Sequence, residues 1–473
     1  MTGVVAAFAL TAGVVAQATA GRLVAGPPDR TFDSVAIDSR TLAAGALFVA
    51  IRGARVDAHA FVPQALERGA SGLLVSRSVD AAGSPAIIQV DDTLGALQAL
   101  GRDVRRRSGA KVIAITGSAG KTTTKEIVAD LLSARYRVVR NAGNLNNHIG
   151  LPLSLVELRH APDVAVMELG MNHAGEILTL VGIAEPDVRV WLNVGDAHLG
   201  HFGSRDALAR AKAEILDMPV PGAVAVVNAD DPLVTRHLAA WSGRVVTFGE
   251  AATADVRASR VEDRGLLGTG ATIDTPGGTL RLDVSLPGRA HLMNVLAAVA
   301  LAVDMSVPLA AIASRVAAMR PIPRRGTTTP LANGATLVDD SYNASPAAVQ
   351  AMLEALRATA VAGRRIAVLG EMLELGDGAR ALHAACGRAA AAAGADTLVV
   401  VGGPDADGLV EGALAAGLAP ARVHRFADSV AAADRVPAFV GPGDVVLVKG
   451  SRGTHMDVVA DRLASLAAGG AGG

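Results

Sequence analysis

Lys111-Val-Ile-Ala-Ile-Thr116, followed directly by Gly117-Ser-Ala-Gly120-Lys121-Thr122, is the stretch that decides the fold of this 473-residue chain. A β-branched run of strand length ends at two glycines, and a helical pattern then continues to about Leu132. A strand, a glycine loop and a helix bring backbone N–H groups together around a phosphate. In such a loop Lys121 reaches the terminal phosphates and the Thr122 hydroxyl binds Mg²⁺. The structural alternative is a tight turn with an incidental lysine, but the flanking strand and helix favour a nucleotide site.

The bulk composition excludes several classes of protein. The formal net charge of −1 gives no electrostatic footprint for nucleic acid. The apolar stretch 1–21 lacks the positive start of a signal peptide, so we expect a short helix and strand there and no stable membrane insertion. A single cysteine, Cys386, permits no intrachain disulfide and fits a reducing, cytoplasmic compartment. The length predicts two to four domains.

The distribution of lysine is informative. Only five of the 44 basic residues are lysine, so the other 39 are arginine. Such a chain is expected to keep lysine where a guanidinium will not serve, because an ammonium can lose its proton and be modified. Lys212 and Lys449 are therefore candidates for a function, as Lys121 already is. Lys111 and Lys125 fit ordinary surface lysines.

The order of predicted elements indicates three α/β domains: an N-terminal domain over 1–90, a central ATP-binding domain with a mostly parallel sheet over 91–319, and a Rossmann-like domain over 320–473. In the first domain, Ser39 and Arg40 follow a predicted strand, where they suit a phosphate or diphosphate. Solvated loops remain the alternative there.

Polar residues gather after the central strands. The stretch 141–150 is rich in Asn and Gly, and its four side-chain amides, at Asn141, Asn144, Asn146 and Asn147, suggest a ligand with many hydrogen-bonding groups. Predicted strands over 163–167 and 188–194 deliver Glu168 and His198 to the carboxyl edge of the sheet. A carboxylate and an imidazole beside a triphosphate indicate ligands for Mg²⁺.

Four motifs together resemble the Mur ligases, the ATP-dependent amide-forming enzymes of peptidoglycan precursor synthesis. They are Gly143-Asn-Leu-Asn-Asn147, Asp339-Asp-Ser-Tyr-Asn-Ala-Ser-Pro346, Leu369-Gly-Glu-Met-Leu-Glu-Leu-Gly376 and Leu447-Val-Lys-Gly-Ser-Arg452. The resemblance runs from about residue 20 to 460. Within the family it favours the branch that joins D-alanyl-D-alanine to UDP-N-acetylmuramoyl-tripeptide.

The resemblance implies roles for individual residues. Glu168, His198 and Thr122 would bind Mg²⁺, and Lys212 would be a carbamate that also ligates the metal. Catalysis would rest on Lys121, Lys212, Glu168 and His198. The residues implied to bind ATP are Gly117, Ser118, Ala119, Gly120, Lys121, Thr122, Thr123, Asn294, Arg325 and Asp340. Tyr342 and Asn343 would lie near the substrates, and the enzyme would act as a monomer.

Two alternatives stay open at this point. One is a sister ligase that adds a diamino acid or glutamate, including folylpolyglutamate synthase. The diamino-acid ligases typically carry an Asp-Asn-Pro-Arg motif in the third domain, and this chain has no such tetrapeptide. The other is a non-catalytic P-loop protein, against which the full set of Lys121, Glu168, His198 and Lys212 argues.

Overall fold

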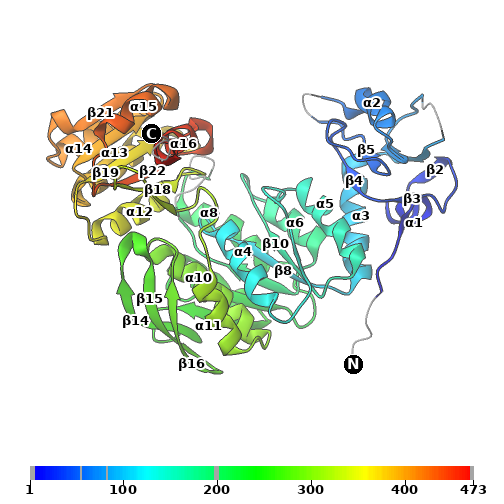
Figure 1. The fold of residues 1–473 in the computed structure, drawn as a ribbon. Helices are drawn as coiled ribbons and strands as arrows, with labels where there is room; N and C mark the ends of the chain where they lie inside the picture. The colour runs from blue at the N-terminus through cyan, green and yellow to red at the C-terminus, as the bar shows by residue number, and fades with distance from the viewer. Residues whose placement is uncertain (1–5, 54–55, 81–83, 196–201, 469–473) are drawn as a thin grey trace.

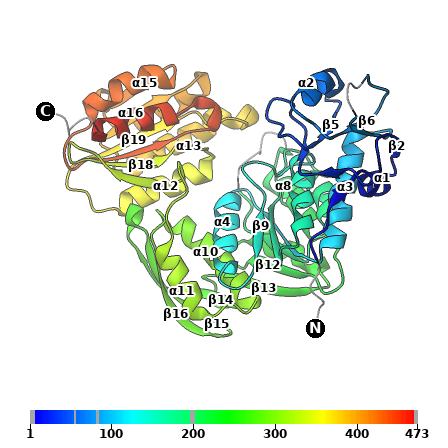
Figure 2. The same cartoon turned by 45° about the vertical axis from the view of Figure 1, so that its right-hand side comes forward.

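The computed structural model describes residues 6–53, 56–80, 84–195 and 202–468. In this part of the chain, three α/β regions follow one another, each built on its own main sheet of five, nine or six strands. The N-terminal region and the C-terminal region lie on opposite sides of the central one (Figures 1 and 2). The three-domain α/β architecture predicted from the sequence is confirmed, while the boundaries at 90/91 and 319/320 stay predictions.

The central sheet has the strand order β16-β15-β14-β13-β12-β11-β8-β10-β9. Seven neighbouring strands run parallel, and β15 and β16 are antiparallel additions at one edge. The strands are β8 (Lys111–Thr116), β9 (Val138–Arg140), β10 (Val164–Glu168), β11 (Val188–Trp191), β12 (Val224–Asn228), β13 (Arg244–Gly249), β14 (Val256–Asp263), β15 (Thr269–Thr275) and β16 (Gly278–Val284). Because β8 lies between β10 and β11, the segments that follow these three strands meet at one edge.

Helices cover both faces of this sheet, which explains the unbroken apolar run of β8. Ile113 and Ile115 pack with α4 and α10 on one face, and Val112 and Ala114 pack with α3, α5 and α6 on the other. The helices of the region are α3 (Thr93–Ser108), α4 (Lys121–Leu132), α5 (Gly150–Val156), α6 (Glu176–Ala184), α8 (Arg205–Ala213), α9 (Pro232–Thr235), α10 (Arg289–Asp304) and α11 (Leu309–Ala318).

The N-terminal sheet has the order β2-β7-β6-β5-β4 and is parallel except for β2. Its elements are β2 (Arg22–Ala25), β4 (Val35–Ala36), β5 (Leu47–Val49), β6 (Gly72–Val75), β7 (Ala86–Gln89) and α2 (Val62–Glu67), preceded by β1 (Leu10–Thr11), α1 (Ala12–Ala18) and β3 (Thr31–Phe32). The short helix and strand predicted for the apolar start are therefore α1 and β2. Among the described residues, no helix has the length and apolar character needed to cross a membrane.

The C-terminal sheet has the order β17-β18-β22-β19-β20-β21, with β17 antiparallel. Its elements are β17 (Thr327–Pro330), β18 (Thr336–Asp340), β19 (Arg365–Gly370), β20 (Thr397–Val401), β21 (Val423–Phe426), β22 (Val445–Lys449), α12 (Pro346–Ala358), α13 (Ala379–Ala392), α14 (Asp407–Ala415), α15 (Ser429–Arg435) and α16 (Asp457–Ala468). This region contacts the central one through the buried hydroxyl of Thr359, which accepts a 2.8 Å hydrogen bond from the Leu266 N–H. The neighbouring strands β18 and β22 end at Asp340 and Lys449.

Candidate active site

The glycine loop joins β8 to α4 as the sequence predicts. Gly120 adopts φ +83°, and a Cβ there would collide with the side-chain amide of Asn294 on α10. Glycine is therefore required both for the backbone conformation and for the close approach. The first bond of α4 joins the Thr124 N–H to the Gly120 carbonyl at 2.8 Å, so the N–H groups of residues 120–123 precede the helical ladder. These donors and the helix dipole favour an anion at this point.

Two lysines converge on one carbonyl of the loop. The Gly117 carbonyl accepts hydrogen bonds from the Nζ of Lys121 at 2.8 Å and from the Nζ of Lys212, at the end of α8, at 3.1 Å. Burial lowers the pKa of Lys121, and Arg325 adds to the lowering while Glu168 opposes it. Burial and then the neighbouring Lys121 charge lower the pKa of Lys212 well below its usual value. Lys212 is only 1% exposed, so an amine is held in a place that disfavours its proton.

Glu168 is positioned at both of its carboxylate oxygens. The hydroxyl of Thr122 donates to Oε2, and the side-chain amide of Asn146 donates to Oε1, each at 2.8 Å. The Asn141 side chain accepts a bond from the Glu168 N–H at 2.9 Å and donates to the Glu168 carbonyl at 3.2 Å. The glutamate is 4% exposed, so its carboxylate is fixed beside the glycine loop.

The oxygen groups of Thr122 and Glu168 are ligand types that Mg²⁺ prefers, and they lie within one hydrogen bond of each other. No cluster of three or more His, Cys, Asp or Glu side chains that could hold a metal occurs among the described residues. The predicted ligand His198 lies outside the residues that the structure describes. Thr122 and Glu168 therefore fit a hard divalent cation as two members of a ligand set.

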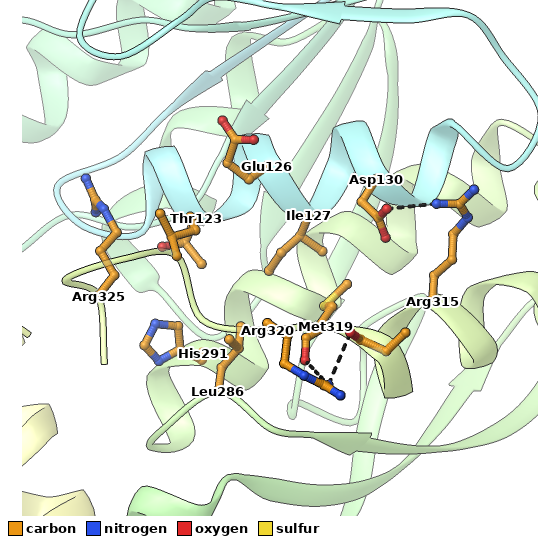
Figure 3. Close-up of a pocket in the computed structure, with 12 residues that line it drawn as sticks. Thr123, Glu126, Ile127, Asp130, Leu286, His291, Arg315, Met319, Arg320 and Arg325 are labelled. Carbon is orange, nitrogen blue, oxygen red and sulfur yellow. Dashed lines mark hydrogen bonds and ion pairs between the residues drawn. The ribbon is translucent and has the colours of Figure 1, made fainter. Parts of the chain in front are cut away.

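A cavity of about 360 Å³ opens beside α4. Figure 3 shows α4 along one side, the start of α10 and the segment 318–325 opposite, and Arg325 and His291 at one end. An ion pair of 2.8 Å between Arg315 and Asp130 lies at the other end. The apolar wall comes from Ile127, Leu286, Met319 and Ile322. A cavity with apolar walls and a cationic end is suited to a flat base that carries a phosphate chain.

His291 lines this cavity with one ring nitrogen engaged. Its Nδ1 lies 2.6 Å from the Pro287 carbonyl and therefore carries the proton of the neutral ring. Burial lowers the pKa of His291, which keeps the ring neutral at pH 7.

The C-terminal region contributes a second group of charges. Lys449 Nζ forms a buried ion pair of 2.6 Å with Asp340 Oδ2 and donates to the Asn343 carbonyl at 3.0 Å. The guanidinium carbon of Arg325 lies 4.2 Å from the centre of the Tyr342 ring. Arg325 also lines the cavity beside α4 together with Thr123, so this stacked arginine brings a charge from the C-terminal region to the site.

The remaining predicted residues lie apart from this cluster or serve local structure. The Ser39 hydroxyl is buried and bonded to the Gln64 side chain at 2.5 Å. Arg40 is exposed and forms a two-point ion pair with Asp38, whose pKa it lowers to about 2. Asn147 Oδ1 accepts from the N–H groups of residues 149 and 150 at the start of α5. Asn144 is exposed in the same loop.

Comparison with known proteins identifies the family. Three family models match: "Mur ligase family, catalytic domain" over 31–129, "Mur ligase middle domain" over 115–302, and "Mur ligase, glutamate ligase domain" over 324–452. The UDP-N-acetylmuramoyl-tripeptide--D-alanyl-D-alanine ligase of Escherichia coli (strain K12) is 38% identical over 439 residues, which cover 92% of this chain and 94% of that protein. The chain belongs to the Mur ligase family.

Solved structures agree with this Mur ligase assignment. MurF from Acinetobacter baumannii superposes with a TM-score of 0.88 at 34% identity, covering 97% of this chain and 99% of that one. The MurF ligase of Thermotoga maritima in complex with ADP gives a TM-score of 0.80 at 29% identity, covering 92% and 98%. The ATP-dependent ligase class predicted from the sequence is thus supported at the level of fold and family.

Three residues organise the site of this Mur ligase in roles that the sequence did not predict. The Asn193 side chain accepts bonds from the N–H groups of Ser118 and Ala119, both at 3.0 Å, and braces the glycine loop. Asn141 clamps Glu168 as described above. Lys125 was expected on the surface, and this was wrong: it is 1% exposed and donates to the Asn141 carbonyl at 2.7 Å. The scarcity of lysine was the available signal for Lys125.

Proposed function

We propose that the protein joins D-alanyl-D-alanine to the terminal carboxylate of UDP-N-acetylmuramoyl-tripeptide, with conversion of ATP to ADP and phosphate. One observation carries the proposal: Lys121, Thr122 and Glu168 lie at the end of the glycine loop, and Arg325, at the start of the C-terminal region, lines the same cavity as Thr123 of α4. This arrangement brings cationic and oxygen groups to a phosphate chain at a junction of two domains. The identity of the E. coli relative as a UDP-N-acetylmuramoyl-tripeptide--D-alanyl-D-alanine ligase supports the choice of substrates.

The reaction has to convert a carboxylate into an acyl group with a good leaving group. A carboxylate oxygen of the tripeptide would attack the γ-phosphorus of ATP, and ADP would leave. Lys121 and Arg325 would neutralise the charge that spreads over the transferred phosphoryl group. The dipeptide amine would then attack the acyl carbon and lose a proton, and phosphate would depart. Enclosure between domains would keep water from the acyl phosphate.

The base and ribose of ATP would occupy the cavity beside α4. Its apolar wall suits the base, and Asn294 lies against Gly120, where the phosphate chain would begin to bend. The N–H groups of residues 120–123 would hold the phosphates, with Ser118, Ala119 and Thr123 completing the loop. Asp340 would contact the nucleotide from the third domain.

Thr122 and Glu168 would hold Mg²⁺ together with Lys212 as a carbamate and with His198. Bound Mg²⁺ would withdraw charge from the phosphate oxygens during transfer. Lys212 suits the modification, because its lowered pKa favours the neutral amine. That amine can attack CO₂, which forms an N–C bond and releases one proton. The resulting anion would lie beside the Lys121 ammonium, which shares the Gly117 carbonyl with Lys212, and would be stabilised by that positive charge.

Substrate recognition is proposed for the residues that the sequence suggested. Ser39 and Arg40 would contact the uridine nucleotide, Asn144, Asn146 and Asn147 the peptide end, and Tyr342 and Asn343 the dipeptide or nucleotide. We further propose a monomer that acts in the cytoplasm, the compartment that supplies ATP and UDP-linked precursors. A diamino-acid ligase is the second candidate within the same family.

The deciding experiment is phosphate release from ATP with purified protein and UDP-N-acetylmuramoyl-tripeptide. We expect release only when D-alanyl-D-alanine is also present, with one phosphate formed for each dipeptide joined. D-alanine alone, a diamino acid and D-glutamate serve as competing amines. Full turnover with one of these and none with the dipeptide would refute the proposed substrate.

A further inference from the structure

Lys125 is buried beside the proposed metal ligands and has no part in the chemistry described above. It is 1% exposed, and its Nζ lies 2.7 Å from the Asn141 carbonyl oxygen and 3.4 Å from Glu126 Oε1. A buried ammonium is costly unless it is hydrogen-bonded, so this bond contributes to holding Asn141 in place.

The side chain of Asn141 in turn holds the backbone of Glu168. Its side-chain oxygen accepts from the Glu168 N–H at 2.9 Å, and its side-chain nitrogen donates to the Glu168 carbonyl at 3.2 Å and to the Leu145 carbonyl at 2.9 Å. Asn141 is 1% exposed, so neither side-chain group can easily exchange its partner for water. The position of Asn141 therefore sets the end of β10, from which the Glu168 carboxylate projects.

A second contact ties the same helix to the same segment. Glu126 Oε2 lies 2.6 Å from Nε of Arg140, the last residue of β9 and the neighbour of Asn141. Thr122, Lys125 and Glu126 are three and four residues apart and so share one face of α4. That face contacts the Glu168 carboxylate through Thr122 and the 140–141 segment through the other two residues.

We propose that Lys125 is a positioning residue, which acts through Asn141 to fix the Glu168 carboxylate beside the Thr122 hydroxyl, where the two would hold a divalent cation. The inference rests on the proposed function, because it takes Glu168 as a metal ligand. Partners of this kind, which hold a ligand without touching the metal, typically change metal affinity or activity by about 10- to 100-fold. Arginine at this position would present a planar fork to a single carbonyl, which explains why this arginine-rich chain keeps a lysine here.

The test compares Lys125→Met with Lys111→Met in the full chain. Methionine keeps an apolar stem and cannot donate to Asn141. Lys111 is the matched control, because it lies exposed at the start of β8. Binding of Mn²⁺ in the presence of ADP is followed by the electron paramagnetic resonance signal of free Mn²⁺. We expect the Kd for Mn²⁺ to rise by about tenfold or more in Lys125→Met and to stay unchanged in Lys111→Met.

A second readout needs neither metal nor nucleotide. Hydrogen–deuterium exchange over residues 164–169 should be faster in Lys125→Met than in the control, since the Glu168 N–H loses a fixed acceptor. A Lys125→Met chain that unfolds at lower urea but binds Mn²⁺ like the wild type would overturn the inference and show that Lys125 only fills the core.

Asn141→Ala keeps the test decisive if Lys125→Met does not fold. It leaves the backbone carbonyl for Lys125 and removes the clamp on Glu168, so Mn²⁺ binding should weaken by a similar factor. Where both variants fold, the double variant Lys125→Met, Asn141→Ala should bind Mn²⁺ no more weakly than the weaker of the two single variants. Additive losses of Mn²⁺ affinity would show that the two residues act independently and would refute the proposal. Wild-type protein that binds no Mn²⁺ with ADP would instead refute the proposed metal site, while Lys125-dependent exchange at 164–169 would still support the positioning role.

Discussion

Lys449→Met should destabilise the C-terminal domain by about 3–5 kcal/mol, because it leaves Asp340 as a buried charge without its partner. The two side chains are 4% and 12% exposed, and their charged atoms lie 2.6 Å apart. At an effective dielectric constant of about 20, Coulomb's law gives an attraction of about 6 kcal/mol, of which desolvation offsets a large part. The variant also loses the hydrogen bond from Lys449 to the Asn343 carbonyl.

The assay is differential scanning calorimetry, which can resolve the transitions of separate domains. For a domain of this size, each kcal/mol shifts Tm by about 2–4 °C, so we expect a decrease of about 6–20 °C in one transition. Arg380→Met is the control, since Arg380 pairs with Glu411 on the surface of the same domain with both side chains 54% exposed. Its effect on Tm should be far smaller than that of Lys449→Met, because solvent screens an exposed pair.

The double variant Lys449→Met, Asp340→Leu separates an unpaired charge from a loss of packing. Replacing both members of a buried ion pair by apolar groups is often neutral or stabilising. We therefore expect the double variant to recover most of the Tm lost in Lys449→Met. The reasoning is refuted if the single variant melts within 2 °C of the wild type, on the order of the shift for 1 kcal/mol, or if the double variant melts below the single one.

Three further predictions concern the site and the N-terminal domain. Lys121→Ala and Glu168→Gln should each lower kcat by roughly a hundredfold or more while the circular dichroism spectrum is retained, as measured by phosphate release. Lys212→Ala should be nearly inactive and partly restored by a small added carboxylate, whereas Lys212→Arg should stay inactive. Incorporation of ¹³CO₂, followed by NMR, would report the carbamate directly. An active Lys212→Arg variant would exclude the carbamate. The folded-state pKa of Asp38, about 2, lies below the usual 3.8, so its pair with Arg40 stabilises the fold above pH 3.8 and this contribution is lost as the pH falls towards 2. The pair is exposed and screened by solvent, so Arg40→Ala should leave the pH midpoint of acid unfolding almost unchanged, and a clear shift of that midpoint would contradict this expectation.

Glutamine is chosen over a truncation at Glu168 because the side chain is held by its neighbours. Glu168 ends β10 at the carboxyl edge of the sheet, yet it is 4% exposed and bonded at both oxygens. Truncation would leave Thr122 and Asn146 without their acceptor. Burial of this kind depends on the loop 141–150 folding back over β10, which no pattern within either segment predicts.

The burial of Lys125 was also not predictable from the sequence. Composition singled out lysine as rare, yet a lysine within an amphipathic helix is most simply placed on its exposed face. Its burial depends on the backbone carbonyl of Asn141, which lies 16 residues away and becomes available only when β9 ends beside α4.

The sequence by itself determined the glycine loop between strand and helix, the three α/β domains, and the family resemblance, because these depend on local periodicity, turn chemistry and short motifs. Only the tertiary structure decided which groups meet. Lys121 and Lys212 share the Gly117 carbonyl, Asn141 clamps Glu168, and Arg325 stacks on Tyr342 and lines the cavity beside α4. These contacts join residues far apart in the chain, and their geometry follows from strand order and helix packing, which local sequence patterns do not encode.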